Sequence, residues 1–420
     1  MKVGIIGSGG REHAICFEIK KSIKVKQIYC IPGNAGTNDI ATNVNIDISN
    51  FKLIKDFIND NKIDLVIVGP EQPLVDGIVD FLTEHNIKVF GPDKTSSKLE
   101  GSKIFTKNIC KKYNIPTSDF GIFRNIDESV KFLNQCKFPI VVKADGLAAG
   151  KGVYICENIE QSSQAVLEIF NGKFGKADQV LIEEFLEGEE MSFFIISDGK
   201  SFKKFGTAQD HKRLKEGDKG PNTGGMGAYS PSRLESEILD DKILNKIIKP
   251  TLEALKDMKT NFKGFLFAGL MIKNEEPYLI EYNVRMGDPE CQTILPRLKT
   301  NFFEIIQATL EGKLDTINFD WHDDKSLCIV LSSKGYPEKF KNNIKIKNLD
   351  KIFLSENEFM FHAGTKLENS SVLSNGGRVL NLVVKSKNFK QSRDRALDLI
   401  KKINWDNGFY RKDIGYKVID

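Results

Sequence analysis

Short apolar runs alternate with amphipathic stretches through the first hundred residues, and this alternation constrains the fold more than any other feature of the chain. The strand-like runs cover residues 2–7, 25–30, 64–68 and 88–90, with helical spacing between them. Such βαβ rhythm predicts a doubly wound α/β domain around a parallel sheet. Gly-Pro pairs close the last two runs, at places where loops that carry binding sites commonly lie.

The remaining residues predict further α/β and α+β units, since 420 residues exceed one compact core. A helix is expected over 102–113. It should end there because the residue before Pro116 avoids the helical region of backbone angles. A small α/β unit, a larger β-rich unit and a last unit from about residue 325 follow it. Their expected helix covers 159–170, and their expected strands are 139–144, 153–156, 179–185, 191–197, 265–272, 278–284, 326–332 and 378–384.

The composition is ordinary for a soluble globular protein, with 40% hydrophobic and 28% charged residues. No apolar run approaches the ~20 residues that span a bilayer, and the first strand follows Met1 and Lys2 without a secretory signal. The net charge of +4 is weak and interleaved with acidic residues, which disfavours nucleic-acid binding. Seven cysteines without a C-x-x-C pair indicate reduced thiols. We expect a cytoplasmic protein with no membrane or nucleic-acid partner.

A glycine-rich turn, GIIGSGGRE over residues 4–12, follows the first strand. A G-x-G turn lets backbone N–H groups approach a phosphate at a helix N-terminus, which would suit a dinucleotide. The dinucleotide fingerprint is incomplete, because Glu12 replaces the third glycine and the second strand ends in YCIP without a carboxylate for a ribose. Another phosphate ligand is therefore favoured over a nicotinamide cofactor or a purely structural turn, and Arg11 favours a phosphate ester.

A second glycine-rich element, KADGLAAGKGV over residues 143–153, lies between two expected strands. It differs from a P-loop because Asp145 replaces the first glycine, Gly152 replaces the Ser or Thr that binds magnesium, and a strand follows. A glycine hairpin that carries Lys143 and Lys151 can still fold over a triphosphate and neutralise it. A solvated hairpin with two ordinary lysines is the alternative.

Two later segments complete a candidate nucleotide and metal site. The apolar strand that ends near residue 186 can lie along an adenine while Glu190 takes the ribose hydroxyls, although acidic runs are usually solvated faces. Glu281, Asn283 and Arg285 share one face of an expected strand, because side chains alternate with period two. The oxygens of the first two suit Mg²⁺ that bridges ATP phosphates, and the arginine can clamp a carboxylate or an acyl phosphate. A solvated polar face is the alternative.

A polar loop carries AQDHKR over residues 208–213 and GPNTGGMG over residues 220–227. His211 could belong to a catalytic dyad, but no Ser or Cys nucleophile signature accompanies it. A substrate-binding loop is favoured over that dyad and over a plain surface loop.

These elements, in this order, resemble the ATP-grasp superfamily and, within it, the phosphoribosylamine-glycine ligase family. IGSGGREH, AQDHKR and GPNTGGMGAYSP together are the stretches most specific to that family. The matching stretches span nearly the whole chain: 6–13 (IGSGGREH), 34–37 (NAGT), 68–75 (VGPEQPLV), 99–103 (LEGSK), 139–153 (PIVVKADGLAAGKGV), 183–190 (EEFLEGEE), 208–213 (AQDHKR), 220–231 (GPNTGGMGAYSP), 281–292 (EYNVRMGDPECQ) and 361–365 (FHAGT).

The resemblance implies four parts, with ATP and Mg²⁺ or Mn²⁺ between the second and third. They are a substrate-binding α/β domain (1–101), an ATP-grasp small or lid domain with its entry helix (102–188), an ATP-grasp large domain (189–325) and a small C-terminal domain (326–420). The family reaction transfers the γ-phosphoryl group of ATP to the carboxylate of glycine. The amine of 5-phosphoribosylamine then displaces phosphate, which gives glycinamide ribonucleotide and ADP in purine synthesis. The implied partners are these small molecules, and we expect a monomer.

The resemblance also implies site residues by their position. Arg285, Lys151 and Asp210 are the candidate catalytic residues. ATP contacts are expected at Lys103, Lys143, Lys151, Glu183, Glu184, Phe185, Leu186 and Glu190, and metal ligands at Glu281 and Asn283. Substrate contacts are expected at Gly9, Gly10, Arg11, Glu12, Asn34, Glu71, Asp210, Lys212, Asn222, Thr223, Arg285 and Asp288.

The chain departs from the family pattern in a few places, and rival functions are kept for comparison. Tyr282, Met286 and Cys291 stand where Phe, Phe and often Thr are expected, and AGLMI over 268–272 offers no further metal carboxylate. The nearest rival function is that of another ATP-grasp carboxylate-amine ligase or a carboxylase-type enzyme. The N-terminal glycine loop and the polar loop over 209–229 argue against that rival. A dehydrogenase would need an acidic residue after the second strand, and a nucleotide sensor would not need the Glu-Asn-Arg face.

Overall fold

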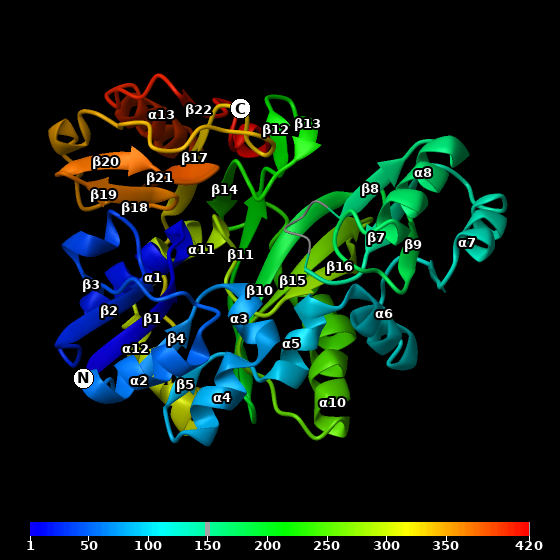
Figure 1. Ribbon diagram of the computed structural model, residues 1–420, viewed down its shortest axis with the longest axis horizontal. Helices are drawn as coiled ribbons and strands as arrows, with labels where there is room; N and C mark the ends of the chain where they lie inside the picture. The colour runs from blue at the N-terminus through cyan, green and yellow to red at the C-terminus, as the bar shows by residue number, and fades with distance from the viewer. Residues whose placement is uncertain (148–151, 420) are drawn as a thin grey trace.

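The computed structural model describes residues 1–147 and 152–419, and its first unit is a parallel sheet with strand order β3-β2-β1-β4-β5 (Figure 1). Val3 and Ile5 pack with α1 on one face, whereas Val66 and Val68 pack with α2 on the other. Burial on both faces explains the continuous apolar strands. The elements are β1 (Lys2–Gly7), α1 (Gly10–Lys20), β2 (Gln27–Pro32), β3 (Thr42–Asn43), α2 (Phe51–Asn61), β4 (Leu65–Val68), α3 (Glu71–Asp76), α4 (Ile78–Glu84), β5 (Val89–Phe90) and α5 (Lys94–Gly101).

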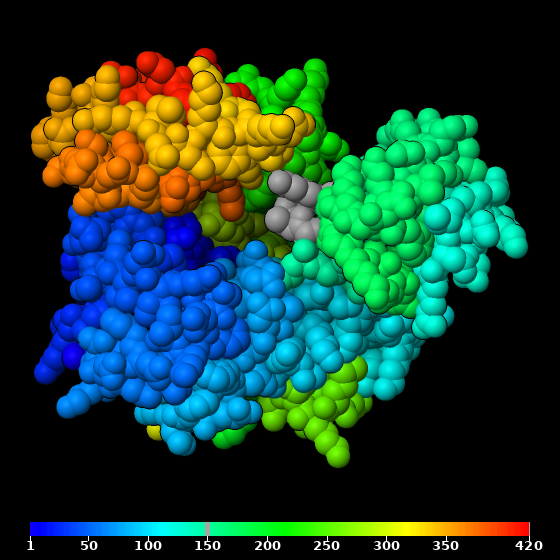
Figure 2. Space-filling view, in the orientation of Figure 1, coloured from blue at the N-terminus to red at the C-terminus, as the bar shows by residue number. Residues whose placement is uncertain are grey.

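The second unit is an antiparallel sheet with strand order β6-β9-β7-β8, and it projects from the side of the molecule (Figure 2). Val142 and Ile182 of this sheet pack with Val166 and Ile169 of its longer helix. Ser102 begins the entry helix, because its hydroxyl accepts the N–H of Phe105. The elements are α6 (Lys103–Lys112), β6 (Phe120–Phe123), α7 (Ile126–Leu133), β7 (Ile140–Ala144), β8 (Val153–Cys156), α8 (Ile159–Phe170) and β9 (Val180–Glu184).

A long antiparallel sheet forms the rest of the molecule, with strand order β16-β15-β10-β11-β14-β17-β21-β18 and with β22 beside β17. Its first half contains β10 (Glu189–Asp198), β11 (Phe202–Asp210), β14 (Gly227–Ser230), β15 (Lys263–Lys273) and β16 (Glu276–Asn283). Its second half contains β17 (Lys325–Ser333), β18 (Glu358–His362), β21 (Arg378–Ser386) and β22 (Gly408–Phe409). Because Tyr229 of β14 pairs with Leu327 of β17, the hydrogen bonding continues across residue 325.

Helices and hairpins cover this sheet and join it to the N-terminal unit. Phe303 of α12 lies in one apolar cluster with Val3 of β1 and Phe194 of β10, so the two units share a core. A hollow is left between the N-terminal unit, the second unit and the C-terminal strands (Figure 2). The covering elements are β12 (Arg213–Lys215), β13 (Lys219–Asn222), α9 (Glu237–Ile243), α10 (Lys249–Asp257), α11 (Glu290–Ile294), α12 (Phe302–Glu311), β19 (Thr365–Glu368), β20 (Ser371–Ser374) and α13 (Phe389–Ile400).

The strands expected from apolar runs are present, with ends that shift by a few residues. β11 and β14 were not predicted, since FKKFGTAQD and GAYS contain no continuous apolar run. The strand expected over 278–284 ends at Asn283, so Arg285 lies in the bend that follows it. Among the described residues, no helix is both long and apolar enough to cross a membrane.

Candidate functional site

The first glycine loop joins β1 to α1, and its shape depends on Glu12. This side chain is 1% exposed, and its carboxylate accepts the N–H of Gly9 at 2.7 Å. A Cβ on Gly7 or Gly69 would lie 2.5 or 2.1 Å from the Glu12 side chain, so these glycines leave room for the carboxylate. Glu12 therefore supports the loop from inside, while Gly9 and Gly10 form the turn into the helix.

Asn34 holds the next loop against the first one. It is buried, and its amide nitrogen donates to the carbonyls of Ser8 at 2.9 Å and His362 at 2.8 Å. Its amide oxygen accepts the N–H groups of Gly36 and Thr37. The expected substrate residue thus has a structural role that orients the loop.

A chain of ion pairs connects the first loop to the end of β16. Nη1 of Arg11 lies 3.8 Å from Oε2 of Glu71, and Nε of Arg285 lies 3.2 Å from the same oxygen. Nη2 of Arg285 also lies 2.7 Å from Oε1 of Glu100, whose other oxygen accepts the N–H of Val284. Arg285 lowers the pKa of Glu71 to about 2, whereas burial raises the pKa of Glu100 to about 7.

β16 places Glu281 and Asn283 on its partly exposed face and buries Tyr282 between them. Cationic groups surround this face. Burial alone would raise the pKa of the Glu281 carboxyl, but positive charges hold it below its ordinary value, and they come from Lys212, Lys143, Lys103 and Arg285 in decreasing order. The strand therefore presents two oxygen-bearing side chains beside positively charged groups, which suits a metal bound together with phosphates.

Glu183 is paired with two lysines, one of which, Lys143, also lowers the pKa of Glu281. Its Oε1 lies 2.9 Å from Nζ of Lys143, and its Oε2 lies 3.2 Å from Nζ of Lys107 and accepts the hydroxyl of Ser118 at 2.8 Å. Burial would raise the pKa of Glu183, which is 4% exposed, but Lys143 and Lys107 hold it below its ordinary value. Glu183 was expected to contact ATP from β9. Its observed contact is instead with Lys143, whose side chain it orients.

The second glycine loop is tied to α6 through Asp145. Its carboxylate accepts the hydroxyl of Ser102 at 3.0 Å and the N–H of Ile104 at 3.2 Å. Nζ of Lys103 donates to the carbonyl of Gly146 at 2.8 Å, and burial followed by repulsion from a neighbouring lysine lowers its pKa. Lys151, the other lysine expected in this loop, lies outside the described residues.

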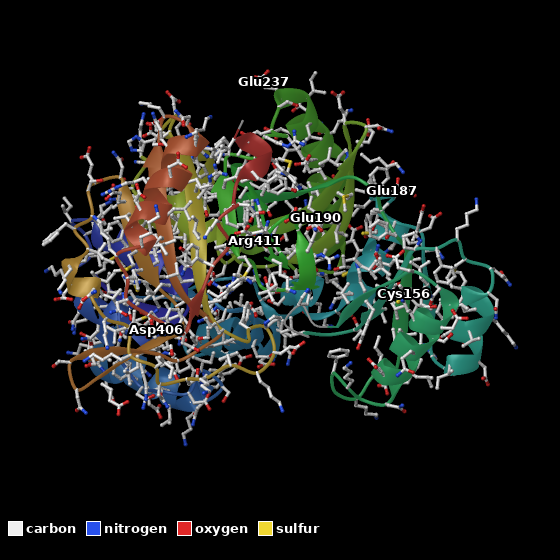
Figure 3. All side chains as sticks on the ribbon, turned by 90° about the horizontal axis from the view of Figure 1, so that it is seen from above. Cys156, Glu187, Glu190, Glu237, Asp406 and Arg411 are labelled. Carbon is white, nitrogen blue, oxygen red and sulfur yellow. The ribbon has the colours of Figure 1, made fainter. Side chains whose placement is uncertain are left out.

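Glu190 and Glu281 meet at Lys212. Nζ of Lys212 lies 2.8 Å from Oε2 of Glu190 and 3.8 Å from Oε1 of Glu281, so the expected ribose and metal positions are adjacent. The chain passes between the second unit and the large sheet at Glu187, and Glu190 lies on the sheet side (Figure 3). The expected adenine segment leads into this crossing, with an exposed Glu184 and partly buried Phe185 and Leu186.

Two residues of the polar loop, Thr223 and His211, make contacts that hold the loop in place. Thr223 bonds to the carbonyl of Lys212 and accepts the N–H of Gly225, so it fixes a turn, and Asn222 ends β13. His211 is buried, and its Nε2 accepts the N–H of Gly415 while burial lowers its pKa to about 4. This contact favours a structural role for the histidine rather than the dyad considered from the sequence.

Asp288 connects the C-terminal strands to the first loop. Its carboxylate accepts the N–H of Arg11 at 3.3 Å and lies 3.4 Å from Nη2 of Arg378, which also donates to its backbone carbonyl. Sequence reasoning missed Arg378, because the arginine only opens an apolar strand run. It also missed Glu100 and Glu290, although both lie inside quoted motifs, LEGSK and EYNVRMGDPECQ.

Family models and relatives show the family of this chain. The models of phosphoribosylglycinamide synthetase match residues 1–100 (N domain), 101–291 (ATP-grasp (A) domain) and 326–417 (C domain). The chain belongs to the phosphoribosylglycinamide synthetase family. A phosphoribosylamine–glycine ligase of Brucella melitensis is 43% identical over 100% of this chain and 99% of its own length, and one of Caldanaerobacter subterraneus is 44% identical over 99% of each.

Solved structures extend the comparison within and beyond the phosphoribosylglycinamide synthetase family. The crystal structure of a phosphoribosylamine–glycine ligase from Thermotoga maritima is 31% identical and superposes with a TM-score of 0.86 over 99% of this chain and 100% of that one. A biotin carboxylase domain from Hydrogenobacter thermophilus, in complex with MgADP, has a TM-score of 0.73 over 97% of this chain and 91% of that one, but only 16% identity, which shows the fold alone.

The family, the α/β and α+β multidomain fold and the ATP-dependent carbon–nitrogen ligase activity expected from the sequence are thus confirmed. The ATP-grasp fold implies ATP with a divalent metal. Glu281 and Asn283 fit that metal, since they offer one carboxylate and one amide oxygen and leave further positions to phosphates and water.

Proposed function

We propose that the chain ligates glycine to 5-phosphoribosylamine through a glycyl phosphate, giving glycinamide ribonucleotide, ADP and phosphate for purine synthesis. One observation carries the proposal: Arg11 and Arg285 approach the same oxygen of Glu71, at 3.8 and 3.2 Å. Arg11 belongs to the glycine loop that suits a sugar phosphate. Arg285 follows β16, which carries the candidate metal ligands Glu281 and Asn283. The amine and the activated carboxylate would therefore meet beside Glu71. Relatives that match the whole chain are named phosphoribosylamine–glycine ligases, which supports these substrates.

The proposed chemistry has two steps. A carboxylate oxygen of glycine takes the γ-phosphoryl group as the bond between that group and ADP breaks. The amine nitrogen then attacks the carbonyl carbon and loses a proton, and phosphate leaves with the electrons of the broken C–O bond. Arg285 neutralises the acyl phosphate, so the site needs positioning and charge neutralisation rather than a covalent nucleophile.

The nucleotide half of the proposal rests on the lysines around Glu281. Lys103 and Lys143 come from the lid side, and Lys212 comes from the polar loop, so ATP phosphates would be enclosed between units. Glu190 would take the ribose, with the segment of Glu184 to Leu186 along the adenine. A bound Mg²⁺ or Mn²⁺ would neutralise and orient the phosphates, and Glu281 and Asn283 would hold it.

The proposal includes the four domains, the oligomeric state and the cellular location expected from the sequence. The domain limits are 1–101, 102–188, 189–325 and 326–420, with the lid in the second part. We propose that the chain works as a cytoplasmic monomer on small molecules.

ADP release is the test of this function. The chain is incubated with MgATP and with glycine, freshly generated phosphoribosylamine, or both, while ADP and glycinamide ribonucleotide are quantified. We expect sustained ADP release only with both substrates, in a 1:1 ratio with the ribonucleotide, because the acyl phosphate is consumed only by the amine. ADP release with bicarbonate or with another carboxylate, and none with glycine, would favour the rival ATP-grasp enzymes.

A further inference from the structure

The polar loop leaves the large sheet after Asp210, the last residue of β11, and residues 411–417 lie against the hairpin of β12 and β13 that the loop forms (Figure 1). Arg411 makes the main contact and is 0% exposed, although arginine is almost never fully buried unless it is paired. Its Nη1 donates to the carbonyl of Arg213 at 2.9 Å and to Oδ1 of Asp218 at 2.9 Å. One buried guanidinium group therefore joins the beginning of the hairpin to its turn.

Further bonds from the same segment fix the turn of the hairpin. Nε and Nη2 of Arg411 donate to the two carboxylate oxygens of Asp413 at 2.8 and 2.7 Å, and Asp413 also accepts the N–H of Gly217 at 2.8 Å. The hydroxyl of Tyr416 donates to Oδ2 of Asp218 at 2.8 Å. Charge-assisted and bidentate bonds of this kind hold their partners in one geometry. The C-terminal segment thus determines how the turn lies.

The hairpin depends on these bonds because it has little core of its own. Residues 213–222 are all exposed or half-buried. Leu214 packs against the apolar cluster of the C-terminal strands, but it is buried only in part. A two-stranded hairpin by itself is marginally stable in water. The position of the hairpin in the molecule therefore rests largely on its contacts with residues 411–417.

The C-terminal segment also holds the residues on both sides of Lys212. Before Lys212, Nε2 of His211 accepts the N–H of Gly415 at 3.1 Å. After it, the carbonyl of Arg213 accepts the bond from Arg411. The backbone of Lys212 is thus held between two residues that the end of the chain fixes.

The side chain of Lys212 extends from this point to the candidate nucleotide site. Its Nζ lies 2.8 Å from Oε2 of Glu190 and 3.8 Å from Oε1 of Glu281. A lysine ammonium is a point charge at the end of a flexible four-carbon stem. Where this charge lies therefore depends on how firmly the backbone that carries the stem is held.

We propose that Arg411 and the segment around it are positioning residues that place the ammonium group of Lys212 in the nucleotide site. This rests on the proposed role of Lys212 beside the ATP phosphates, and it makes the end of the C-terminal domain a support of that site. Arg411 would act through the backbone of Lys212 and would not contact ATP itself. Its effect on ATP binding should therefore require the side chain of Lys212.

A double-mutant cycle in the full chain tests this requirement. The dissociation constant of MgATP is measured for the wild type, Arg411→Lys, Lys212→Ala and the double variant. Lysine keeps the charge of Arg411 but cannot reach Arg213, Asp218 and Asp413 together. We expect each single variant to bind MgATP about 10-fold more weakly, since a charge-assisted contact is lost or displaced. The double variant should also bind roughly 10-fold more weakly, whereas independent effects would multiply to about 100-fold.

Arg395→Lys is the matched control. Arg395 contacts both carboxylate oxygens of Glu358, at 2.6 and 3.2 Å, in the same C-terminal domain. Its loss should cost a similar bidentate contact and leave the affinity for MgATP within about twofold of the wild type, because its partner lies outside the polar loop.

The remaining outcomes separate the positioning role from the proposed function. An effect of Arg411→Lys that persists in full without Lys212 overturns the positioning role, as does wild-type affinity in either single variant. Should Arg411→Lys fail to fold, Tyr416→Phe takes its place in the cycle. Tyr416 is 40% exposed, and its bond to Asp218 should be worth about threefold in affinity, again only with Lys212 present. The cycle needs neither glycine nor phosphoribosylamine, so a wild type that forms no glycinamide ribonucleotide would end the proposed function and leave this test intact.

Discussion

Glu71 is the residue at which the two arginines of the candidate site meet. Arg285 lowers its pKa to about 2, so it stays ionised at neutral pH and holds both guanidinium groups without taking up a proton. Arg285 also bonds to Glu100, which leaves part of its guanidinium committed before any substrate binds. Such an arginine is fixed in advance, and fixed donors stabilise developing charge without reorganising.

Arg285→Ala should abolish ligation while it leaves ATP affinity nearly intact. Turnover should fall by about 100-fold or more, because a fixed donor to the acyl phosphate is lost. ATP dissociation constants should stay within about threefold, since Lys103, Lys143 and Lys212 remain. Product formation and equilibrium ATP binding measure the two effects. Arg285→Lys keeps the charge without the fork geometry and should recover only part of the turnover, whereas normal turnover in the alanine variant would remove Arg285 from the mechanism.

At the scale of elements, hydrogen bonds join the start of α6 to the second glycine loop. Asp145 belongs to the loop, yet its carboxylate accepts the N–H of Ile104 and the hydroxyl of Ser102 at the start of the helix. In the other direction, Nζ of Lys103 donates a hydrogen bond to the carbonyl of Gly146. Asp145 and Gly146 are therefore joined to the first turn of the helix by bonds in both directions.

Asp145→Ala should affect both helix and nucleotide. Loss of the acceptor should reduce the free energy of unfolding by about 1–2 kcal/mol and should weaken ATP binding several-fold, because Lys103 and its loop lose their common support. Urea unfolding and ATP titration give the two values. Asn158→Ala is the matched control: it removes the N-cap of α8 in the same unit and should lower stability similarly with unchanged ATP affinity. Equal ATP affinity in both variants would show that Asp145 only caps a helix.

The sequence predicted elements with apolar runs and motifs with dense glycine or charge. The strands of the N-terminal unit and the face of Glu281 and Asn283 were visible because burial and alternation leave a local pattern. Glu100 and Arg378 were not identified, since their partners lie 185 and 90 residues away along the chain. Such contacts depend on how units pack, and no local period encodes them.

The whole molecule is joined by charged contacts as well as by a shared apolar core. α5 ends the N-terminal unit, and its Glu100 bonds to the backbone of Val284 and the side chain of Arg285 in the large unit. Burial raises the pKa of this carboxyl to about 7, against an ordinary value of 4.5. A contact between units thus titrates near neutral pH, while Glu71 beside it titrates at about 2.

Glu100→Gln should change how the stability of the molecule depends on pH. A carboxyl whose pKa is raised on folding stabilises the fold fully below about pH 4.5, and this contribution is lost as the pH rises through 7. From about pH 5 to 8, the free energy of unfolding of Glu100→Gln should therefore rise relative to the wild type by up to roughly 3 kcal/mol. Urea unfolding of both proteins across this range measures the difference. Glu237→Gln, at an exposed carboxylate of α9, is the control and should run parallel to the wild type. Parallel curves for Glu100→Gln would mean that Glu100 stays ionised between the two units.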